Sequence, residues 1–227
     1  MEPLHTAPDL IEQVYLRLVD AIADGSLAPN ARITQEEIAQ RLSVSRQPVS
    51  HALQLLRRQG LVVRQGRRGL AVAPVEPDRI RDLYQVRAAL DGLAARLAAK
   101  RIKTGSARPQ EIKQLRSRLA AGRGSADGGS THDWIELDVA FHASIYALSG
   151  NVIIAETVAE RWLYFKRGMG VALVSREWRK LVWRQHAGIA ERILAGDPAG
   201  AETAAREHAE NAATKLYAEL VAAAGGT

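Results

Sequence analysis

The chain has 227 residues, of which 47% are hydrophobic and 25% charged, with a formal net charge of +6 at pH 7. This length accommodates one large or two modest domains, and the composition is typical of a folded globular protein. The absence of cysteine excludes disulfides, thiolate metal ligands and a cysteine nucleophile, which leaves His, Asp, Glu, Asn and water as possible metal ligands.

The sequence has no features of a membrane or secreted protein. No apolar run reaches the roughly 18 residues needed to cross a bilayer. The first residues, Met1 to His5, lack the basic start and apolar core of a signal peptide. We therefore expect a cytoplasmic protein with no membrane partner.

Positive charge is concentrated in one segment near the N-terminus. Between Arg41 and Val75 the chain has seven arginines and no acidic residue. A local field of this sign favours a polyanionic partner, with nucleic acid as the first candidate. A solvated basic face is the alternative.

The first 75 residues predict a winged helix-turn-helix. Helices are expected over residues 9–24, 35–42 and 46–59. Thr34 and Glu37 have the spacing of a capping box for the second helix, and Ser45 is expected to cap the third. The β-prone runs 61–63 and 70–72 flank a basic, glycine-containing tip and predict a hairpin. Two short helices, a tight turn and a basic hairpin are typical of this DNA-binding fold.

The motifs of this segment resemble the DNA-binding domain of GntR-type transcriptional regulators over about residues 10 to 75. The resemblance rests on Val44-Ser45-Arg46-Gln47-Pro48-Val49, Ala52-Leu53, Leu56, Gly60-Leu61-Val62 and Arg68-Gly69. In that family the recognition helix starts at the Ser-Arg pair. The resemblance therefore implies that Arg46 reads a guanine edge, with Gln47 nearby and the helix N-terminus facing phosphate.

One departure from the family pattern concerns Ser50 and His51, which stand where many members have arginine and glutamate. A second base-reading arginine is thus absent, and the operator of relatives should not be transferred. The residues expected to contact DNA are Thr34, Ser45, Arg46, Gln47, Ser50, His51, Arg67 and Arg68. For Arg67 and Arg68, phosphate contact and plain solvation are both open.

A second, all-α domain is predicted after a short linker. Two prolines around Glu76 disfavour helix, so we expect a winged-helix domain over residues 8–73, a linker over 74–77 and a helical domain over 78–223. Helices are expected over residues 78–102, 110–121, 133–149, 152–194 with one break near 174–175, and 199–223. Asp78 is expected to cap the first of these, and Thr131 or Asp133 the third.

No strand pattern follows residue 75. Six or seven helices with short connections predict an antiparallel bundle. The expected fold is thus mostly α: an N-terminal winged helix-turn-helix followed by an all-α antiparallel bundle.

Three histidines and one aspartate on apolar helices form a possible metal site. Asp138 and His142 are four residues apart and therefore share one helix face. His186 and His208 lie about 10 and 11 residues from the Gly196-Asp197-Pro198 turn, or roughly 15 Å along each helix, so an antiparallel hairpin brings them to one level. A lone buried histidine is more often a hydrogen-bonded core residue, and this alternative is open for each.

The order Asp138-x3-His142, His186, His208 resembles the metal site of FCD-type effector domains over about residues 78 to 222, a combination found in the FadR-like subfamily. The resemblance implies a divalent ion, with zinc first and nickel or iron as alternatives. It also implies open coordination positions for the carboxylate of a small organic acid. Arg87 and Asn211 are candidate effector-binding residues, although an ion pair with Asp91 and a solvent-facing amide are equally plausible roles for them.

These expectations describe a homodimeric transcription regulator that binds a pseudo-palindromic operator in double-stranded DNA. A small organic-acid effector at the His/Asp metal site modulates its operator affinity. The alternatives are an architectural DNA-binding protein with a purely structural metal and a metal-dependent hydrolase. Against the enzyme, the chain has no zinc-protease motif, nucleophile elbow or phosphate loop, and no catalytic residue is expected.

Overall fold

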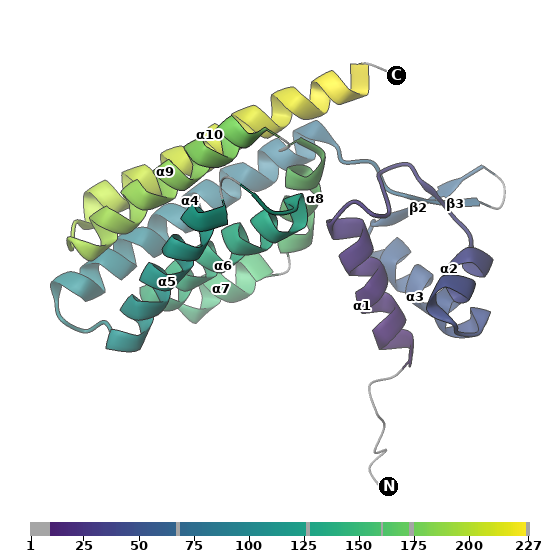
Figure 1. Cartoon of the computed structure of the whole chain (residues 1–227), viewed down its shortest axis with the longest axis horizontal. Helices are drawn as coiled ribbons and strands as arrows, with labels where there is room; N and C mark the ends of the chain where they lie inside the picture. The colour runs from purple at the N-terminus through teal and green to yellow at the C-terminus, as the bar shows by residue number, and fades with distance from the viewer. Residues whose placement is uncertain (1–9, 67–68, 126–127, 160, 173–174, 226–227) are drawn as a thin grey trace, which may run out of the picture. The chain divides into compact units, whose positions relative to one another are not determined.

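The computed structural model describes residues 10–66, 69–125, 128–159, 161–172 and 175–225. The chain divides into two compact units between Val75 and Glu76 (Figure 1). Among the described residues, no helix is long and apolar enough to cross a membrane.

The described residues of the N-terminal unit form three helices and a three-stranded sheet. Its elements are α1 (Leu10–Ala23), β1 (Arg32–Ile33), α2 (Gln35–Leu42), α3 (Arg46–Arg58), β2 (Val62–Gln65) and β3 (Gly69–Val72). The sheet is antiparallel with strand order β1-β3-β2. The wing predicted from the sequence is the β2–β3 pair, whereas β1 was not predicted because two residues are too few to show an alternating pattern.

The core of this unit lies between α1 and α3. Val14, Leu18 and Ile22 of α1 are buried, as are Leu53 and Leu56 of α3. This spacing of three or four residues puts each apolar set on one helix face. The opposite face of α3 is thereby left to solvent.

The helix ends in this unit fix where α3 begins. Thr34 caps α2 as predicted, because its Oγ1 accepts a hydrogen bond from the Glu37 N–H at 3.2 Å. The turn then passes through Ser43, whose φ of 54° lies in the left-handed region. Ser45 occupies the N-cap position of α3, but its side chain makes no capping hydrogen bond, so the predicted side-chain cap is wrong.

The C-terminal unit is a helical bundle with no strand among its described residues. Its helices are α4 (Pro77–Lys103), α5 (Pro109–Ser125), α6 (Thr131–Ser149), α7 (Val152–Ala159), α8 (Trp162–Ala172), α9 (Arg176–Leu194) and α10 (Pro198–Gly225). Figure 1 shows α4 and α10 running side by side along the bundle. The predicted fold class, a winged helix-turn-helix followed by a helical bundle, is confirmed.

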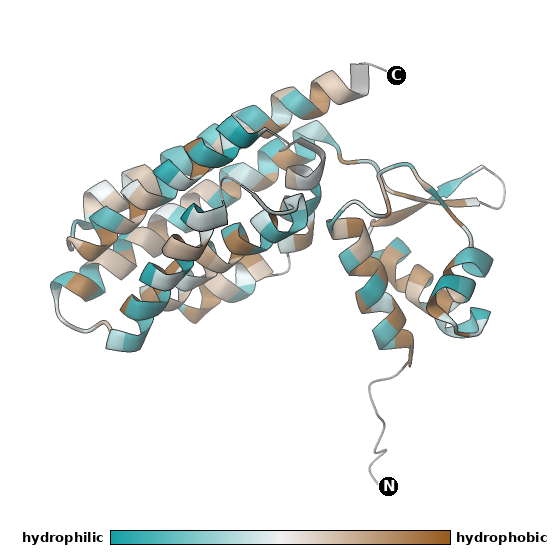
Figure 2. Ribbon diagram, in the orientation of Figure 1, coloured by the Kyte–Doolittle hydropathy of each residue, from teal (hydrophilic) through white to brown (hydrophobic). Residues whose placement is uncertain are grey.

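Small residues allow α4 and α10 to pack closely. Ala94, Ala95, Ala98 and Ala99 of α4 are fully buried, and a Cβ on Gly92 would lie only 3.3 Å from the carbonyl oxygen of Glu202 on α10. Figure 2 shows hydrophobic and hydrophilic residues on the same helices, as expected for amphipathic helices that bury one face. This packing sets the position of the α10 residues that face the bundle interior.

Three predicted helix boundaries in this unit are wrong. Asp78 does not cap α4, because the helix begins at Pro77 and Asp78 forms an ion pair with Arg81 in the first turn. The cap of α6 is Ser130, which forms a capping box with Asp133. The segment predicted to be helical from 152 to the 174–175 break is divided, since α7 ends at Ala159 and α8 begins at Trp162.

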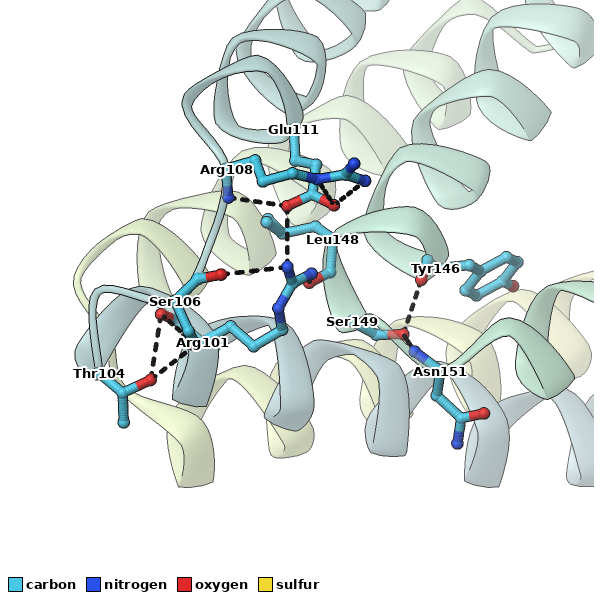
Figure 3. Close-up of polar contacts among 9 residues, drawn as sticks. All are labelled: Arg101, Thr104, Ser106, Arg108, Glu111, Tyr146, Leu148, Ser149 and Asn151. Carbon is cyan, nitrogen blue, oxygen red and sulfur yellow. Dashed lines mark hydrogen bonds and ion pairs between the residues drawn. The ribbon is translucent and has the colours of Figure 1, made fainter.

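Ion pairs and hydrogen bonds around the buried carboxylate of Glu111 join three helices at one end of the bundle (Figure 3). Arg101 of α4 donates to the carbonyl of Leu148 in α6 at 2.6 Å and to the carboxylate of Glu111 in α5 at 3.0 Å. Arg108 donates to the same carboxylate through Nε and Nη2. These bonds hold the C-terminal end of α6, the helix that carries Asp138 and His142.

Loss of these ion pairs is expected to destabilise the bundle in a pH-dependent way. The hydrogen bonds from Arg108 lower the pKa of Glu111 from 4.5 to about 2. The folded-state pKa is below the ordinary value, so the stabilisation is complete above about pH 4.5 and is lost as pH falls toward 2. We expect Glu111→Gln to lower the free energy of unfolding at pH 7 by roughly 1–3 kcal/mol, measured by urea unfolding.

The control for this change is Glu210→Gln. Glu210 pairs with Arg206 at 3.6 Å, but both side chains are more than half exposed, and such pairs contribute little. Equal effects of the two substitutions, or a Glu111→Gln effect that stays constant from pH 7 to pH 3, would contradict this role.

Candidate metal centre and DNA interface

Four buried side chains from three helices converge in the middle of the bundle. Asp138 and His142 come from α6, His186 from α9 and His208 from α10. One ligand atom from each lies within 4.8 Å of the others, and none of the four is more than 5% exposed. The structure therefore brings together all four metal ligands expected from the sequence.

The Nε2 atoms of the histidines face one another and the Asp138 carboxylate. His186 Nε2 lies 3.1 Å from His208 Nε2 and 3.5 Å from Asp138 Oδ1, and His142 Nε2 lies 3.9 Å from Asp138 Oδ2. Two imidazole nitrogens bound to one zinc at about 2.0–2.1 Å are separated by roughly 3.0–3.4 Å. The His186–His208 separation is the one that a shared ion requires.

Two rings have polar contacts on the side away from the cluster: a hydrogen bond for His208 and a longer contact with a carboxylate for His142. His142 Nδ1 lies 3.4 Å from Asp91 Oδ2, and His208 Nδ1 is 2.9 Å from Gln185 Oε1. When Nδ1 carries the proton and donates it, Nε2 keeps its lone pair for a metal, an arrangement that metal-ligating histidines commonly show. Asp91 and Gln185 thus act as orienting partners of the cluster.

The protonation states also fit a metal. Burial lowers the pKa of His142 and His186 well below the ordinary value and that of His208 to about 3, so all three imidazoles are neutral at pH 7. His142 Nε2 is buried without a hydrogen-bond partner, which is costly unless something binds there. Neutral imidazoles and one carboxylate are the donor set of divalent zinc, nickel or iron.

A buried guanidinium lies beside the cluster. Arg87 of α4 is 3% exposed, and its Nη2 lies 3.8 Å from Asp138 Oδ2. Its Nε donates to Asp91 Oδ2 at 3.3 Å and its Nη1 to the Tyr84 hydroxyl at 3.2 Å. The pair with Asp91 considered from the sequence is therefore present, and Arg87 also faces the cluster. The two roles are not exclusive.

A small cavity adjoins the four ligands. Its volume of about 10 Å³ holds about one water molecule. The side chains that line it come from five helices: Tyr84, Arg87, Trp134, Asp138, Met169, Trp178, Val182, His208 and Ala212. Any larger ligand must displace some of them.

The predicted DNA-contacting residues gather at the start of α3. Ser45, Arg46, Gln47 and His51 are exposed, and Ser50 is partly buried with its Oγ 3.4 Å from Gln35 Nε2. The Arg46 side chain is 67% exposed, with Nη2 3.2 Å from Glu36 Oε1 of α2. An ion pair this exposed contributes little to stability, so the Arg46 guanidinium can leave Glu36 at little cost.

The chain matches the family model of the FCD domain over residues 82–211 and that of bacterial regulatory proteins of the gntR family over residues 10–72. The chain belongs to the GntR family. It is a transcriptional regulator with a GntR DNA-binding domain and an FCD domain, and not an enzyme.

Curated proteins similar to this GntR-family chain are also transcriptional regulators. The chain is 31% identical over 201 residues to an uncharacterized HTH-type transcriptional regulator of Streptomyces ambofaciens, covering 86% of this chain and 80% of that one. It is 25% identical over 197 residues to the HTH-type transcriptional repressor RspR of Escherichia coli, covering 87% and 84%.

Solved structures share the fold of the regulator. E. coli McbR/YncC superposes with a TM-score of 0.76 at 21% identity, over 93% of this chain and 98% of that one. The metal-free FCD domain of TM0439 gives a TM-score of 0.52 at 19% identity, over 65% and 97%. These likenesses establish the fold alone.

Two predicted DNA contacts, Arg67 and Arg68, lie outside the described residues, so their roles stay predictions. Asn211 is exposed on α10 and does not line the cavity, whereas Ala212 does. Since Asn211 is three residues after His208, its side chain is turned about 60° from that of His208 around the helix. The structure gives its expected role in effector binding no geometric support.

Sequence reasoning missed the residues that surround the ligands. Asp91 was noted only as a neighbour of Arg87, and Gln185, Tyr146 and Trp134 were given no role. Their contacts join different helices, as with the Tyr146 hydroxyl that donates to Asp91 across 55 residues of sequence. The only signal in the sequence was that a polar Asp91 stands on the apolar stripe of α4.

Proposed function

We propose that this GntR-family regulator senses a small organic acid through a divalent metal held by Asp138, His142, His186 and His208. The acid alters the affinity of the α3 face for an operator in double-stranded DNA. The observation that carries the proposal is the convergence of four buried ligand atoms within 4.8 Å, beside a buried guanidinium. A bound divalent ion supplies positive charge and open coordination positions for a carboxylate. Zinc is the first candidate, and nickel or iron are alternatives.

The chain's own residues account for recognition of an acid. Arg87 lies between Asp91 and Asp138 and directs its donors toward both, and guanidinium donors suit carboxylate oxygens. The aromatic rings of Tyr84, Trp162 and Phe165 lie about it, with centroids 4.9–5.2 Å from its Cζ. These rings exclude water and strengthen the interaction with an anion.

The small volume of the cavity supports coupling between acid binding and helix movement. Its walls come from α4, α6, α8, α9 and α10, and a space for about one water is too small for an organic acid. Binding therefore requires some of these helices or their side chains to shift. A ligand that binds only the shifted arrangement changes the population of that state, which is the requirement for allostery.

The proposal includes a cytoplasmic homodimer that binds a pseudo-palindromic operator, because twofold symmetric DNA sites match twofold symmetric proteins. It assigns DNA binding to residues 8–73, a linker to 74–77 and sensing to 78–223. The proposed DNA contacts are Ser45, Arg46, Gln47, Ser50 and His51 at the start of α3 and Thr34 at the N-cap of α2. Arg67 and Arg68, which follow β2 in the sequence, belong to the same proposal.

The test uses an operator selected by the full chain from random DNA. Its dissociation constant is measured with metal-loaded and chelated protein, each with and without a panel of small carboxylates. We expect one acid to change the dissociation constant by about 5-fold to 150-fold, and only when metal is present. If chelation unfolds the bundle and no acid has any effect, the protein is an architectural DNA binder with a structural metal.

Replacement of Arg46 tests the DNA-reading part of the proposal. We expect Arg46→Ala to reduce discrimination between the operator and random DNA by about 1–3 kcal/mol, because a bidentate contact to guanine is lost. Arg58 at the other end of α3 is the matched control, and Arg58→Ala is expected to preserve the sequence preference. An Arg46→Ala variant that weakens binding to all sequences equally would show a phosphate contact in place of a base contact.

A further inference from the structure

An open groove follows one exposed face of α9, the helix labelled in Figure 1. Its volume is about 590 Å³, and its lining consists of Arg123 of α5 and seven residues of α9 between Glu177 and Glu191. At about 1.5 Å per residue, these α9 positions span roughly 21 Å of the helix. A groove of this length along one helix suits an elongated partner, such as a second helix, better than a compact small molecule.

Two exposed charges in the groove are not paired within the chain. Arg184 and Glu191 both line the groove, and no group among the described residues forms an ion pair with either. They are seven residues apart, which places them on the same face and roughly 10 Å apart along α9. A helix that carries the same two charges in the reverse direction is complementary to this face.

The surface between these two charges is open at Gly188. A Cβ at this position would have no atom within 4 Å, although Gly188 lies in the interior of α9, where glycine is unfavourable. Other glycines of the bundle are needed for packing within the chain, since a Cβ on Gly122 would overlap the Trp183 ring and one on Gly92 would press on α10. The missing side chain at Gly188 therefore has no role in packing within the chain, but it allows another chain to approach closely.

A second copy of α9 has the required charges and shape. When two copies of a helix cross antiparallel about a twofold axis, each residue faces the one at the same distance on the other side of the axis. With the axis between Ala187 and Gly188, Ala187 faces Gly188 of the partner subunit. Arg184 then faces Glu191 of the partner subunit, and the reverse pair forms as well, because positions 184 and 191 are equally distant from the axis. The small residues at the crossing allow the helix axes to approach to about 8 Å.

Neighbouring registers lack this complementarity. An axis one turn earlier, at Arg184, places Arg184 against Arg184 of the partner subunit and Glu177 against Glu191 of the partner subunit. An axis one turn later, at Glu191, places two glutamates together. Like charges in contact disfavour a pairing, so the charge pattern selects the register with its axis between Ala187 and Gly188.

We propose that the α9 groove is the contact surface between two copies of this chain, which cross antiparallel at Ala187 and Gly188 with reciprocal Arg184–Glu191 ion pairs. This inference rests on the proposed function, because that function requires a homodimer, and it assigns the dimer contact to α9 of the C-terminal unit.

The first test measures self-association of the zinc-loaded full chain by analytical ultracentrifugation over a range of concentrations. We expect a reversible dimer whose dissociation constant rises at least about tenfold in Gly188→Gln, because the new side chain overfills the crossing point in both copies. The fold of the single copy should be preserved, since a Cβ at 188 meets no atom of its own chain and glutamine is a better helix former than glycine.

The second test exchanges the charges. Arg184→Glu and Glu191→Arg each place like charges together at both pairs, so each variant alone should dimerise at least about tenfold more weakly. An equimolar mixture of the two variants, one of them fluorescently labelled, should form mixed dimers with native affinity, because every pair then has opposite charges. Misfolding of either variant cannot produce this recovery.

Arg192→Glu is the matched control for the charge exchange. Arg192 is exposed on α9 but does not line the groove, and it is turned about 100° around the helix from Glu191. The substitution changes the net charge as Arg184→Glu does. It is expected to leave the dissociation constant unchanged and to give no mixed-dimer preference with Glu191→Arg.

A native dimer whose affinity is unaffected by Gly188→Gln, or charge variants that show no preference for mixed dimers, would overturn the inference. The homodimer of the proposed function would then stand, with its contact on another surface. A native chain that stays monomeric at all concentrations, both free and on the operator, would overturn the inference together with the proposed homodimer.

Discussion

Replacing His186 with alanine is expected to abolish stable metal binding. His186 is fully buried, and its Nε2 is close to both His208 Nε2 and Asp138 Oδ1. Loss of a residue that only orients a ligand typically lowers metal affinity 10-fold to 100-fold, so loss of a ligand itself should lower it by at least about 100-fold. Elemental analysis of the purified protein and competition with a chromophoric chelator measure the change.

His132→Ala is the control for this substitution. His132 lies on α6, the same helix as His142, but it is exposed and outside the cluster. We expect it to keep the metal content of the native chain. Because His186 is far in sequence from α3, operator binding by the folded DNA-binding unit should persist in the His186→Ala protein. If the His186→Ala protein kept the metal content of the native chain, His186 would not be a metal ligand.

The second large effect is expected from Arg87→Met. This change removes a buried positive charge that lies close to Asp91 and Asp138. Leaving buried charges without a partner costs about 3–5 kcal/mol, and methionine fills much of the same volume. We expect a loss of this size in the unfolding free energy of the metal-free protein, measured by urea unfolding. Saturating zinc is expected to restore part of it, because the ion supplies the missing positive charge.

Arg96→Met provides the comparison on the same helix. Arg96 pairs with Glu202 at 3.5 Å, and both side chains are more than 40% exposed, so the expected loss is below about 1 kcal/mol. Equal losses for Arg87→Met and Arg96→Met would contradict the electrostatic role of Arg87. A zinc effect of the same size in the native and Arg87→Met proteins would do so as well.

Much of the fold was predictable because turn residues mark most helix boundaries, including those of the long helices α4, α6 and α10. The helices α1, α2 and α3 of the winged helix-turn-helix also have a strong apolar period. Errors occurred where local signals are weak. The segment between Ala159 and Trp162 has no glycine or proline to mark the break between α7 and α8, so the pattern predicts one continuous helix. The cap at Ser130 was missed because several capping residues stand in a row there.

The candidate site was predictable only in part. Ligands on one helix, such as Asp138 and His142, follow from spacing, and the turn before α10 places His186 opposite His208. The orienting contacts from Asp91 and Gln185 depend on the rotation of each helix about its own axis, which spacing along one helix does not define. The unknown rotation of α10 also explains why Asn211 was predicted to bind the effector. Asn211 is exposed, whereas the next residue, Ala212, lines the cavity.

The most direct test of the account is anomalous diffraction at the zinc absorption edge from crystals of the zinc-loaded protein. The account predicts one strong anomalous peak per chain, at about 2.0–2.2 Å from the Nε2 atoms of His142, His186 and His208 and from a carboxylate oxygen of Asp138. The absence of a peak at this position from fully loaded protein, or a peak held by other residues, would contradict it.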